Sequence, residues 1–179
     1  MKPTCHVPVL PEAVQEVLQP ARGGFFVDAT LGGGGHAEQL LAASPELRLL
    51  AIDRDADAIE RARERLAEYG DRVVYAHAPF SAIESLVAEH HGGPVDGVLA
   101  DFGLSSDQLA DRERGFAFQQ DGPLDMRMDL NTQKTSAARL LAETSPETAI
   151  EVLTPLVERQ RATSTTPDDE FLIKHYVTA

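Results

Sequence analysis

The sequence predicts an α/β fold in which helices cover both faces of a parallel β-sheet. Apolar, β-branched segments alternate along the chain with segments whose apolar residues recur at helical spacing. A run of glycines follows the first apolar segment, and an acidic residue ends the second, at the strand ends where such sheets bind ligands. With 179 residues, the chain has room for one ordinary domain and a small appendage.

Four segments are expected to be strands, because each is short, apolar and bounded by turn residues. They are residues 25–30, 47–53, 72–78 and 95–102. A helical segment separates each strand from the next, so we expect parallel neighbours in the spatial order 3-2-1-4. This order leaves an open edge on the fourth strand, through which two copies of the chain could pair as a homodimer.

Two helices are expected between the first three strands. A short helix over 37–43 follows the glycine run. The segment 56–69 places apolar residues on one face, and Asp57 and Arg61 lie one turn apart on the other, where they can pair. Gly70 follows this segment and predicts a left-handed C-cap for the second helix.

The region after the third strand is predicted to contain a helix and then a long loop. Ser81 and Glu84 form a capping-box pattern, which opens a helix that ends near His90. Residues 103–135 are polar and contain glycine, without a sustained apolar period. We therefore expect a functional loop with short turns there.

Two short helices are expected near the C-terminal end of the chain. They span 136–143 and 146–153, and Ser145 is the predicted N-cap of the second. Pro155 is expected to stop that helix. The residues after it include a Ser/Thr/Pro-rich acidic segment that predicts a flexible tail over 154–179.

The composition excludes several classes of protein. The lone Cys5 excludes a disulfide framework and a cysteine-based zinc site. No run reaches ~18 consecutive apolar residues and no signal peptide is evident, so we expect a cytoplasmic protein without a membrane segment. The net charge of −13 argues against general nucleic-acid binding, so that any RNA contact must come from a local patch.

The glycine loop after the first strand has the sequence arrangement of a nucleotide site. Glycines let the backbone approach a ligand closely, and Asp53 lies 21 residues beyond Gly32, where a carboxylate can bind ribose hydroxyls. Gly32, Gly34 and Ala37 also satisfy the G-x-G-x-x-A pattern of dinucleotide sites. That pattern alone is weak. It leaves open a tight turn without a ligand and an NAD-dependent oxidoreductase.

Asp28, immediately before the glycine loop, favours a different ligand. A pyrophosphate site presents backbone amides and a helix N-terminus, and a carboxylate beside it would repel the phosphates. S-adenosylmethionine has no phosphate and carries an ammonium and a sulfonium, which a carboxylate attracts. Asp28 therefore favours a methyl donor, although it can also hold the turn by accepting hydrogen bonds from loop amides.

Two further residues follow strand ends that should face the same ligand. Phe80 comes just after the third strand and offers an apolar surface for an adenine, or packs against the start of the next helix. Asp101 ends the fourth strand, close to the expected position of the transferred methyl group.

Four segments together resemble one family: DATLGGGGHAEQLL, LLAIDRDADAI, APFSAI and DGVLADFGLSSDQLADRERGFAFQQDGPLDMRMD. It is the bacterial ribosomal RNA small-subunit methyltransferase H family, which methylates the N4 amine of a cytosine in the decoding region of 16S rRNA. The resemblance covers about residues 6–153 and is most specific from Ser105 to Asp129. It implies a Rossmann-like class I methyltransferase fold, S-adenosyl-L-methionine as cofactor, and 16S rRNA or the small ribosomal subunit as partner.

The resemblance also implies which residues contact the cofactor. The implied contacts are Gly33, Gly34, Gly35, His36, Asp53, Phe80, Asp101 and Gln108. We add Asp28 to this set because of its negative charge. For His36 we expect the backbone amide at the helix start to matter more than the imidazole. Asp101 is the expected catalytic residue, since it can accept hydrogen bonds from the amine as its nitrogen becomes tetrahedral. The reaction requires no metal.

The loop with the most specific motif supplies the candidate RNA contacts. Phe116 and Phe118 offer stacking faces for a base that leaves its stack. Arg112, Arg114 and Arg127 offer phosphate contacts. Alternatively, each phenylalanine belongs to a local core beneath the loop.

The chain departs from the family in length, because family members carry further strands after the matching region. It therefore resembles a C-terminally truncated member. The expected organisation is an incomplete cofactor domain over 1–103, a substrate loop with a partial helical insertion over 104–153, and a divergent tail over 154–179. Two functions follow: a methyltransferase impaired by truncation, or a catalytically silent remnant that binds the cofactor or the ribosome.

Overall fold

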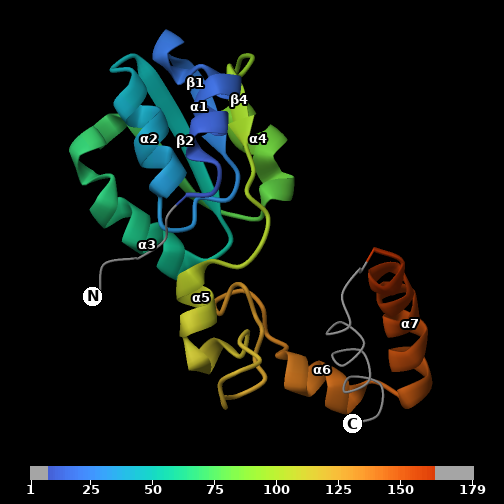
Figure 1. Cartoon of the computed structure of the whole chain (residues 1–179). Coiled ribbons are helices and arrows are strands. Elements are labelled where there is room, and N and C mark those ends of the chain that lie inside the picture. The colour runs from blue at the N-terminus through green and yellow to red at the C-terminus, as the bar shows by residue number, and fades with distance from the viewer. Residues whose placement is uncertain (1–7, 164–179) are drawn as a thin grey trace. The chain divides into compact units, whose positions relative to one another are not determined.

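A computed structural model describes residues 8–163 and divides the chain into two units between residues 134 and 135. The first unit holds a four-stranded sheet in the order β3-β2-β1-β4, and all neighbouring strands are parallel (Figure 1). The strands are β1 (Gly24–Asp28), β2 (Leu47–Asp53), β3 (Val73–His77) and β4 (Gly97–Leu99). The predicted α/β class and strand order are confirmed.

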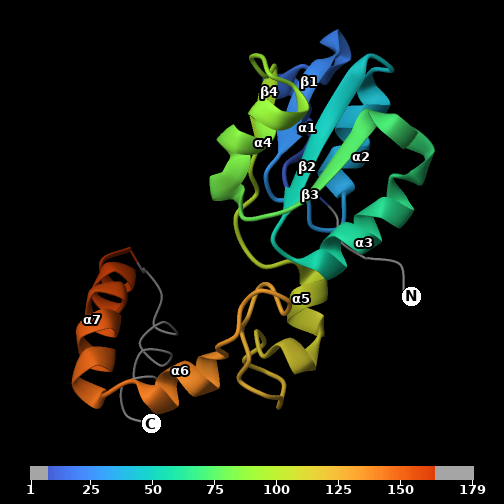
Figure 2. The same cartoon turned by 180° about the vertical axis from the view of Figure 1, so that it is seen from behind.

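Helices cover both faces of this sheet, as Figures 1 and 2 show from opposite sides. The first unit contains the helices α1 (Pro11–Leu18), α2 (Gly35–Ala43), α3 (Ala56–Arg65), α4 (Ile83–His90) and α5 (Ser106–Ala110). Side chains from α1, α2 and α3 join the core on one face of the sheet, and those from α4 join the core on the other.

The central strands are mostly apolar because both of their faces are buried. On β1, Phe26 faces the α2 and α3 side, whereas Phe25 and Val27 face the α4 side. Leu49 and Leu50 of β2 alternate in the same way, and both are fully buried. The sheet therefore separates two hydrophobic cores and holds the loops at its carboxyl edge in fixed positions.

Strand β4 is shorter than the predicted strand over 95–102. It pairs with β1 from Gly97 to Leu99, and a side chain adds a hydrogen bond on either side. Before it, the Asp96 carboxylate accepts a hydrogen bond from the Phe25 amide at 2.7 Å. After it, the Asp101 amide donates to the Thr30 hydroxyl. Among the described residues, no strand covers the outer edge of β4.

The helix expected over 56–69 ends early, at Arg65, and the left-handed cap predicted at Gly70 is wrong. A 3-10 turn over Ala67–Arg72 follows, and Gly70 lies within it at φ 52° and ψ −129°, outside the left-handed helical region. The tighter turn is held by Arg72, whose guanidinium donates to two carbonyl groups at the end of α2.

The capping box predicted from Ser81 and Glu84 is also wrong. A 3-10 turn over Phe80–Ala82 precedes α4, and the N-cap is Ala82, which makes no side-chain cap bond. The tight turn moves the N-cap by one residue, from Ser81 to Ala82, and the Ser85 hydroxyl donates to the carbonyl of Ala82.

The second unit holds α6 (Ala137–Glu143) and α7 (Pro146–Thr163). The hydroxyl of Ser145 accepts a hydrogen bond from the Thr148 amide and caps α7 as predicted. Pro155 lies inside α7 and does not stop it, so the helix end predicted there is wrong. The tail predicted to be flexible is therefore helical up to residue 163, and its remainder lies outside the described residues. No helix within residues 8–163 has the length and apolarity needed to cross a bilayer.

Candidate functional site

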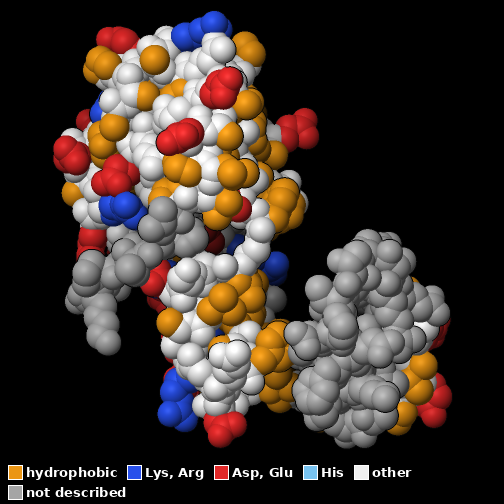
Figure 3. Space-filling view, viewed as in Figure 1, with side chains coloured by type: hydrophobic (Ala, Val, Ile, Leu, Met, Phe, Trp, Pro, Cys, Tyr) orange, Lys and Arg blue, Asp and Glu red, His pale blue; other side chains and the backbone are white. Residues whose placement is uncertain are grey.

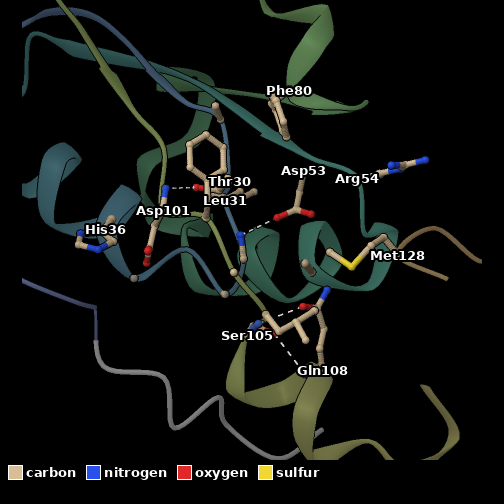
Figure 4. A pocket seen from close by; sticks show the side chains of 18 of the residues that line it. Thr30, Leu31, His36, Asp53, Arg54, Phe80, Asp101, Ser105, Gln108 and Met128 are labelled. Atoms are coloured by element: carbon tan, nitrogen blue, oxygen red, sulfur yellow. Dashed lines mark hydrogen bonds between the residues drawn. The ribbon is translucent and has the colours of Figure 1, made fainter. Parts of the chain in front are cut away.

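A cavity of about 500 Å³ opens at the carboxyl ends of the strands, within the first unit (Figure 4). Its walls come from the loop after β1, the end of β2, the turn after β3, the segment after β4 and the start of α5. Seven of the residues proposed above as cofactor contacts line it: Gly33, Gly35, His36, Asp53, Phe80, Asp101 and Gln108. Topology thus brings together residues that lie up to 75 positions apart, from 33 to 108 in the sequence.

The glycine loop reaches the cavity because its backbone turns tightly between β1 and α2. The Leu31 amide donates to the carbonyl of Ile52, and the Gly34 amide donates to the carbonyl of Leu31. Gly34 is the N-cap of α2 at φ 78°, and it does not line the cavity. A Cβ atom there would lie 3.3 Å from the Cβ of Ala62, so this glycine lets α2 pack closely on α3.

Asp53 at the end of β2 joins the glycine loop to the next helix. Its Oδ2 accepts from the Gly32 amide at 2.7 Å, and its Oδ1 accepts from the Asp55 amide at 2.8 Å. Burial raises the pKa of Asp53, and the hydrogen bonds from backbone amides oppose that rise. Figure 4 shows the carboxylate facing the cavity, where its remaining lone pairs can accept further hydrogen bonds.

Asp28 lies next to the cavity without lining it. The residue is 1% exposed, and its carboxylate accepts a hydrogen bond from the Thr30 amide at 3.1 Å. The pKa of Asp28 rises to about 7, mainly because of burial; the Thr30 hydrogen bond opposes this rise, and the charges of Asp53 and Asp101 add to it. Asp28 therefore holds the turn and adds negative potential near neutral pH, and a direct contact with a ligand remains a prediction.

The segment after β4 presents Asp101 and an aromatic pair at the cavity. Asp101 is held by its amide, which donates to the Thr30 hydroxyl at 2.7 Å, while its side chain stays exposed. Phe80 and Phe102 meet edge to face with ring centroids 5.4 Å apart, and both are more than half exposed. The exposure of Phe80 fits an apolar wall better than the packing role considered above. Phe102 and Thr30 are site residues that the sequence analysis did not single out.

Gln108 is held within the fold as well as lining the cavity. It is 6% exposed, and its side-chain amide donates to Asp55 at 2.8 Å. Gln108 also forms a reciprocal capping box with Ser105, which starts α5 inside the expected loop. The S-x-x-Q spacing is a known signal for a helix start and could have predicted α5.

In the loop after α5, three of the five residues predicted to contact RNA are buried or paired within the protein. Arg114 is 5% exposed and pairs with Asp55, so it offers no phosphate contact. Phe116 is 8% exposed beneath the loop, which supports the local-core alternative. Arg127 donates to both carboxylate oxygens of Asp125, which offsets its charge.

Two of the candidate RNA contacts remain accessible. The Arg112 side chain is mostly exposed beside Glu113, and Phe118 is 73% exposed. In Figure 3 the basic side chains of this face form small, separate groups among acidic and apolar ones. The described surface in that view is consistent with the acidic composition.

One ion pair predicted within α3 is made elsewhere. Arg61 lies 3.6 Å from the carboxylate of Asp107 in α5, instead of pairing with Asp57 one turn away. The loop acid reaches the half-buried Arg61, while Asp57 is exposed and approaches Arg114 at 4.0 Å. Electrostatic contacts therefore tie the loop to α3 at more than one point.

A parallel sheet with a glycine loop after its first strand and an acid at the end of its second defines a Rossmann-like α/β protein with a ligand cavity at the strand ends. The sequence model of the MraW methylase family matches residues 3–166. The chain belongs to this family.

Curated relatives carry the name "Ribosomal RNA small subunit methyltransferase H". The protein of Thermobifida fusca is 53% identical over 135 residues, which cover 74% of this chain and 41% of the relative. The protein of Beutenbergia cavernae is 50% identical over 77% of this chain and 42% of the relative. That of Geobacter sp. strain M21 is 48% identical over 79% and 45%. The chain thus spans less than half the length of these relatives.

Solved structures show a partial likeness. An rRNA methylase from Streptococcus thermophilus matches 52% of this chain and 55% of its own length, with 19% identity and a TM-score of 0.39. A SAM-dependent O-methyltransferase from Thermotoga maritima matches 54% of this chain and 37% of its own length, with 16% identity and a TM-score of 0.41.

Proposed function

We propose that this chain binds S-adenosyl-L-methionine in the cavity and belongs to an enzyme that methylates the N4 amine of a cytosine in the decoding region of 16S rRNA. The observation that carries the proposal is the charge of the cavity. Asp53 and Asp101 line it, and Asp28 lies buried beside it. Arg54 is the one Lys or Arg among the described lining residues. With Asp28, whose pKa is about 7, the acids outnumber this cation, which disfavours a pyrophosphate and favours an ammonium and a sulfonium.

The cavity also fits the rest of that cofactor. Its volume of about 500 Å³ lies in the range of small-molecule sites. Asp53 would hold the ribose hydroxyls, Phe80 would cover one face of the adenine, and the backbone of Gly33 and Gly35 would line the methionine part. Family membership and the names of the relatives support the same cofactor.

Once bound, S-adenosylmethionine supplies an electrophilic methyl group. The chain's own contribution is to orient the amine and to accept its proton. The Thr30 hydroxyl accepts from the Asp101 amide and fixes the backbone there, and Asp101 lines the cavity. There it can accept hydrogen bonds from the exocyclic amine, whose lone pair is delocalised into the ring until the nitrogen becomes tetrahedral. Phe102 and Phe118 offer apolar surfaces to a base outside its stack.

A calorimetric titration with S-adenosylmethionine tests the binding half of the proposal, and NAD serves as the control ligand. We expect saturable heat with the methyl donor and none with NAD. A folded protein that gives neither heat nor a thermal shift with saturating donor would refute the assignment of the cavity.

Methyl transfer is tested separately, on small subunits that lack the modification, by incorporation of tritiated methyl groups. Incorporation that Asp101→Ala abolishes supports the enzyme, with the small ribosomal subunit as partner and the cytoplasm as its location. Binding without incorporation favours the second candidate, a silent cofactor- or ribosome-binding protein. The exposure of the segment around Asp101 is the observation that keeps this second candidate open.

A further inference from the structure

Three segments of the chain meet on the carboxylate of Asp55, which is 2% exposed. Oδ1 accepts a hydrogen bond from the Asp57 amide at 3.0 Å and caps α3. Oδ2 accepts from the side-chain amide of Gln108 at 2.8 Å and from Nη1 of Arg114 at 3.0 Å. One buried acid therefore joins the second βα unit of the sheet to two points of the following loop.

Arg114 extends this junction further along the loop. Its Nη2 donates to the carbonyl groups of Arg127 and Met128 at 3.1 and 3.0 Å. Its own carbonyl accepts from the Met126 amide at 2.9 Å. The guanidinium, oriented by Asp55, thus holds the loop segment 126–128 in place.

Both ends of this network reach the cavity. Gln108 and Met128 line it, and each is bonded to the Asp55–Arg114 pair through a side chain or a carbonyl group. On the other side, the Asp55 amide donates to Asp53, the acid at the end of β2. The cavity wall and the loop are therefore fixed by the same pair of charges.

Burial makes this pair sensitive to change. The side chains of Arg114 and Asp55 are 6% and 3% exposed, so that losing the cation leaves a carboxylate without compensation in a low dielectric. Arg114 uses Nη1 and Nη2 inside the protein. Arg114 therefore binds groups inside the protein, whereas Arg112 on the same turn is exposed to solvent.

We propose that Asp55 and Arg114 are a positioning pair that couples occupancy of the cavity to the order of the loop over 104–133. With the pair intact, Gln108 and Met128 close one wall of the cavity, and a bound S-adenosyl group stabilises the loop in return. The two effects are equal in free energy because the coupling is reciprocal. The identity of the ligand in this inference rests on the proposed function. The role of the pair in ordering the loop does not depend on that function.

Hydrogen exchange on the whole chain without ligand tests the structural half. Arg114→Met should lower the protection of amides in 104–133 about tenfold while β1 and β2 keep theirs. Asp55→Asn retains an N-cap for α3 and should give the same pattern in a milder form. The matched control is Arg139→Met, which breaks an exposed ion pair with Glu143 in the second unit and should leave 104–133 unchanged.

Titration with S-adenosylhomocysteine tests the coupling. Arg114→Met should raise Kd about tenfold, and Arg114→Lys should restore part of the loss. The wild-type loop should gain protection on saturation, and the loop of Arg114→Met should gain less.

Three results would overturn the proposal: equal loop protection in wild type and Arg114→Met, a loss of protection spread evenly over the sheet, or an unchanged Kd in a variant whose loop has loosened. If the wild type binds no S-adenosylhomocysteine, the proposed function fails. The exchange pattern without ligand then decides whether the pair positions the loop.

Discussion

Replacing Asp53 with asparagine exchanges one carboxylate oxygen for an NH2 group. The exchange affects the two hydrogen bonds that this carboxylate accepts from backbone amides. The wild-type carboxylate accepts from the Gly32 amide through Oδ2 and from the Asp55 amide through Oδ1. An asparagine side chain has a single acceptor oxygen, so one of these two amides would face an NH2 group. The variant therefore disturbs the glycine loop or the start of α3 as well as the ligand contact.

The magnitude follows from these bonds. A lost hydrogen bond to a charged group costs about 1.5–3 kcal/mol. Burial disfavours the charge of Asp53 and raises its pKa, so removing the charge offsets part of that cost. We expect the free energy of unfolding to fall by about 1 kcal/mol. The ribose contact should weaken by about 1–3 kcal/mol, which raises Kd roughly 5- to 150-fold.

Calorimetric titration with S-adenosylhomocysteine measures Kd, and urea unfolding without ligand measures stability. Asp71→Asn, at an exposed acid in the 3-10 turn after α3, is the control. A wild-type Kd in Asp53→Asn would show that the carboxylate does not contact the ligand, and the assignment of the ribose to the end of β2 would then be refuted.

Three further changes test other parts of the structure. Because the pKa of Asp28 rises from 3.8 to about 7 on folding, protonation favours the folded state, and about 4 kcal/mol of stability present below about pH 4 is lost as pH rises through 7. Asp28→Asn should reduce the difference between the free energies of unfolding measured with urea at acid and at neutral pH. An unchanged difference would contradict the raised pKa of Asp28. Gly34→Ala, at φ 78° with its Cβ 3.3 Å from that of Ala62, should cost about 1–2 kcal/mol in chemical unfolding, and a loss near zero would count against the close packing of α2 on α3. Gly115→Ala, at φ 69° and facing the carbonyl of Pro123, should speed proteolysis of the loop while thermal unfolding of the sheet changes little, and equal cleavage rates would oppose it.

Strand positions and strand order could be predicted because both faces of the sheet are buried. β2 matches its predicted range because Leu49 to Ile52 form a buried apolar run that ends at the polar Asp53. Parallel pairing then requires that residues at the carboxyl ends lie together. For that reason Asp53, Phe80 and Asp101 could be assigned to one site from their places after strands.

The loop could not be predicted in the same way. Asp55 and Arg114 are 59 positions apart, and no local pattern shows that a loop arginine turns inward to a helix cap. Local signals also failed where tertiary contacts override them, as at Gly70, where Arg72 holds a tighter turn. The side-chain amide of Gln108 shows the same limit, because its partner lies in a distant βα unit.

The pairing of β1 with β4 has a consequence for synthesis on the ribosome. Phe26 pairs with Gly97, and the Asp96 carboxylate bonds the amide of Phe25 across 71 positions. The first strand therefore leaves the exit tunnel long before its second neighbour exists, and one of its edges stays without a partner while about 70 residues are added. We expect a nascent chain stalled before residue 99 to expose that edge to chaperones, and one stalled well beyond it to resist protease.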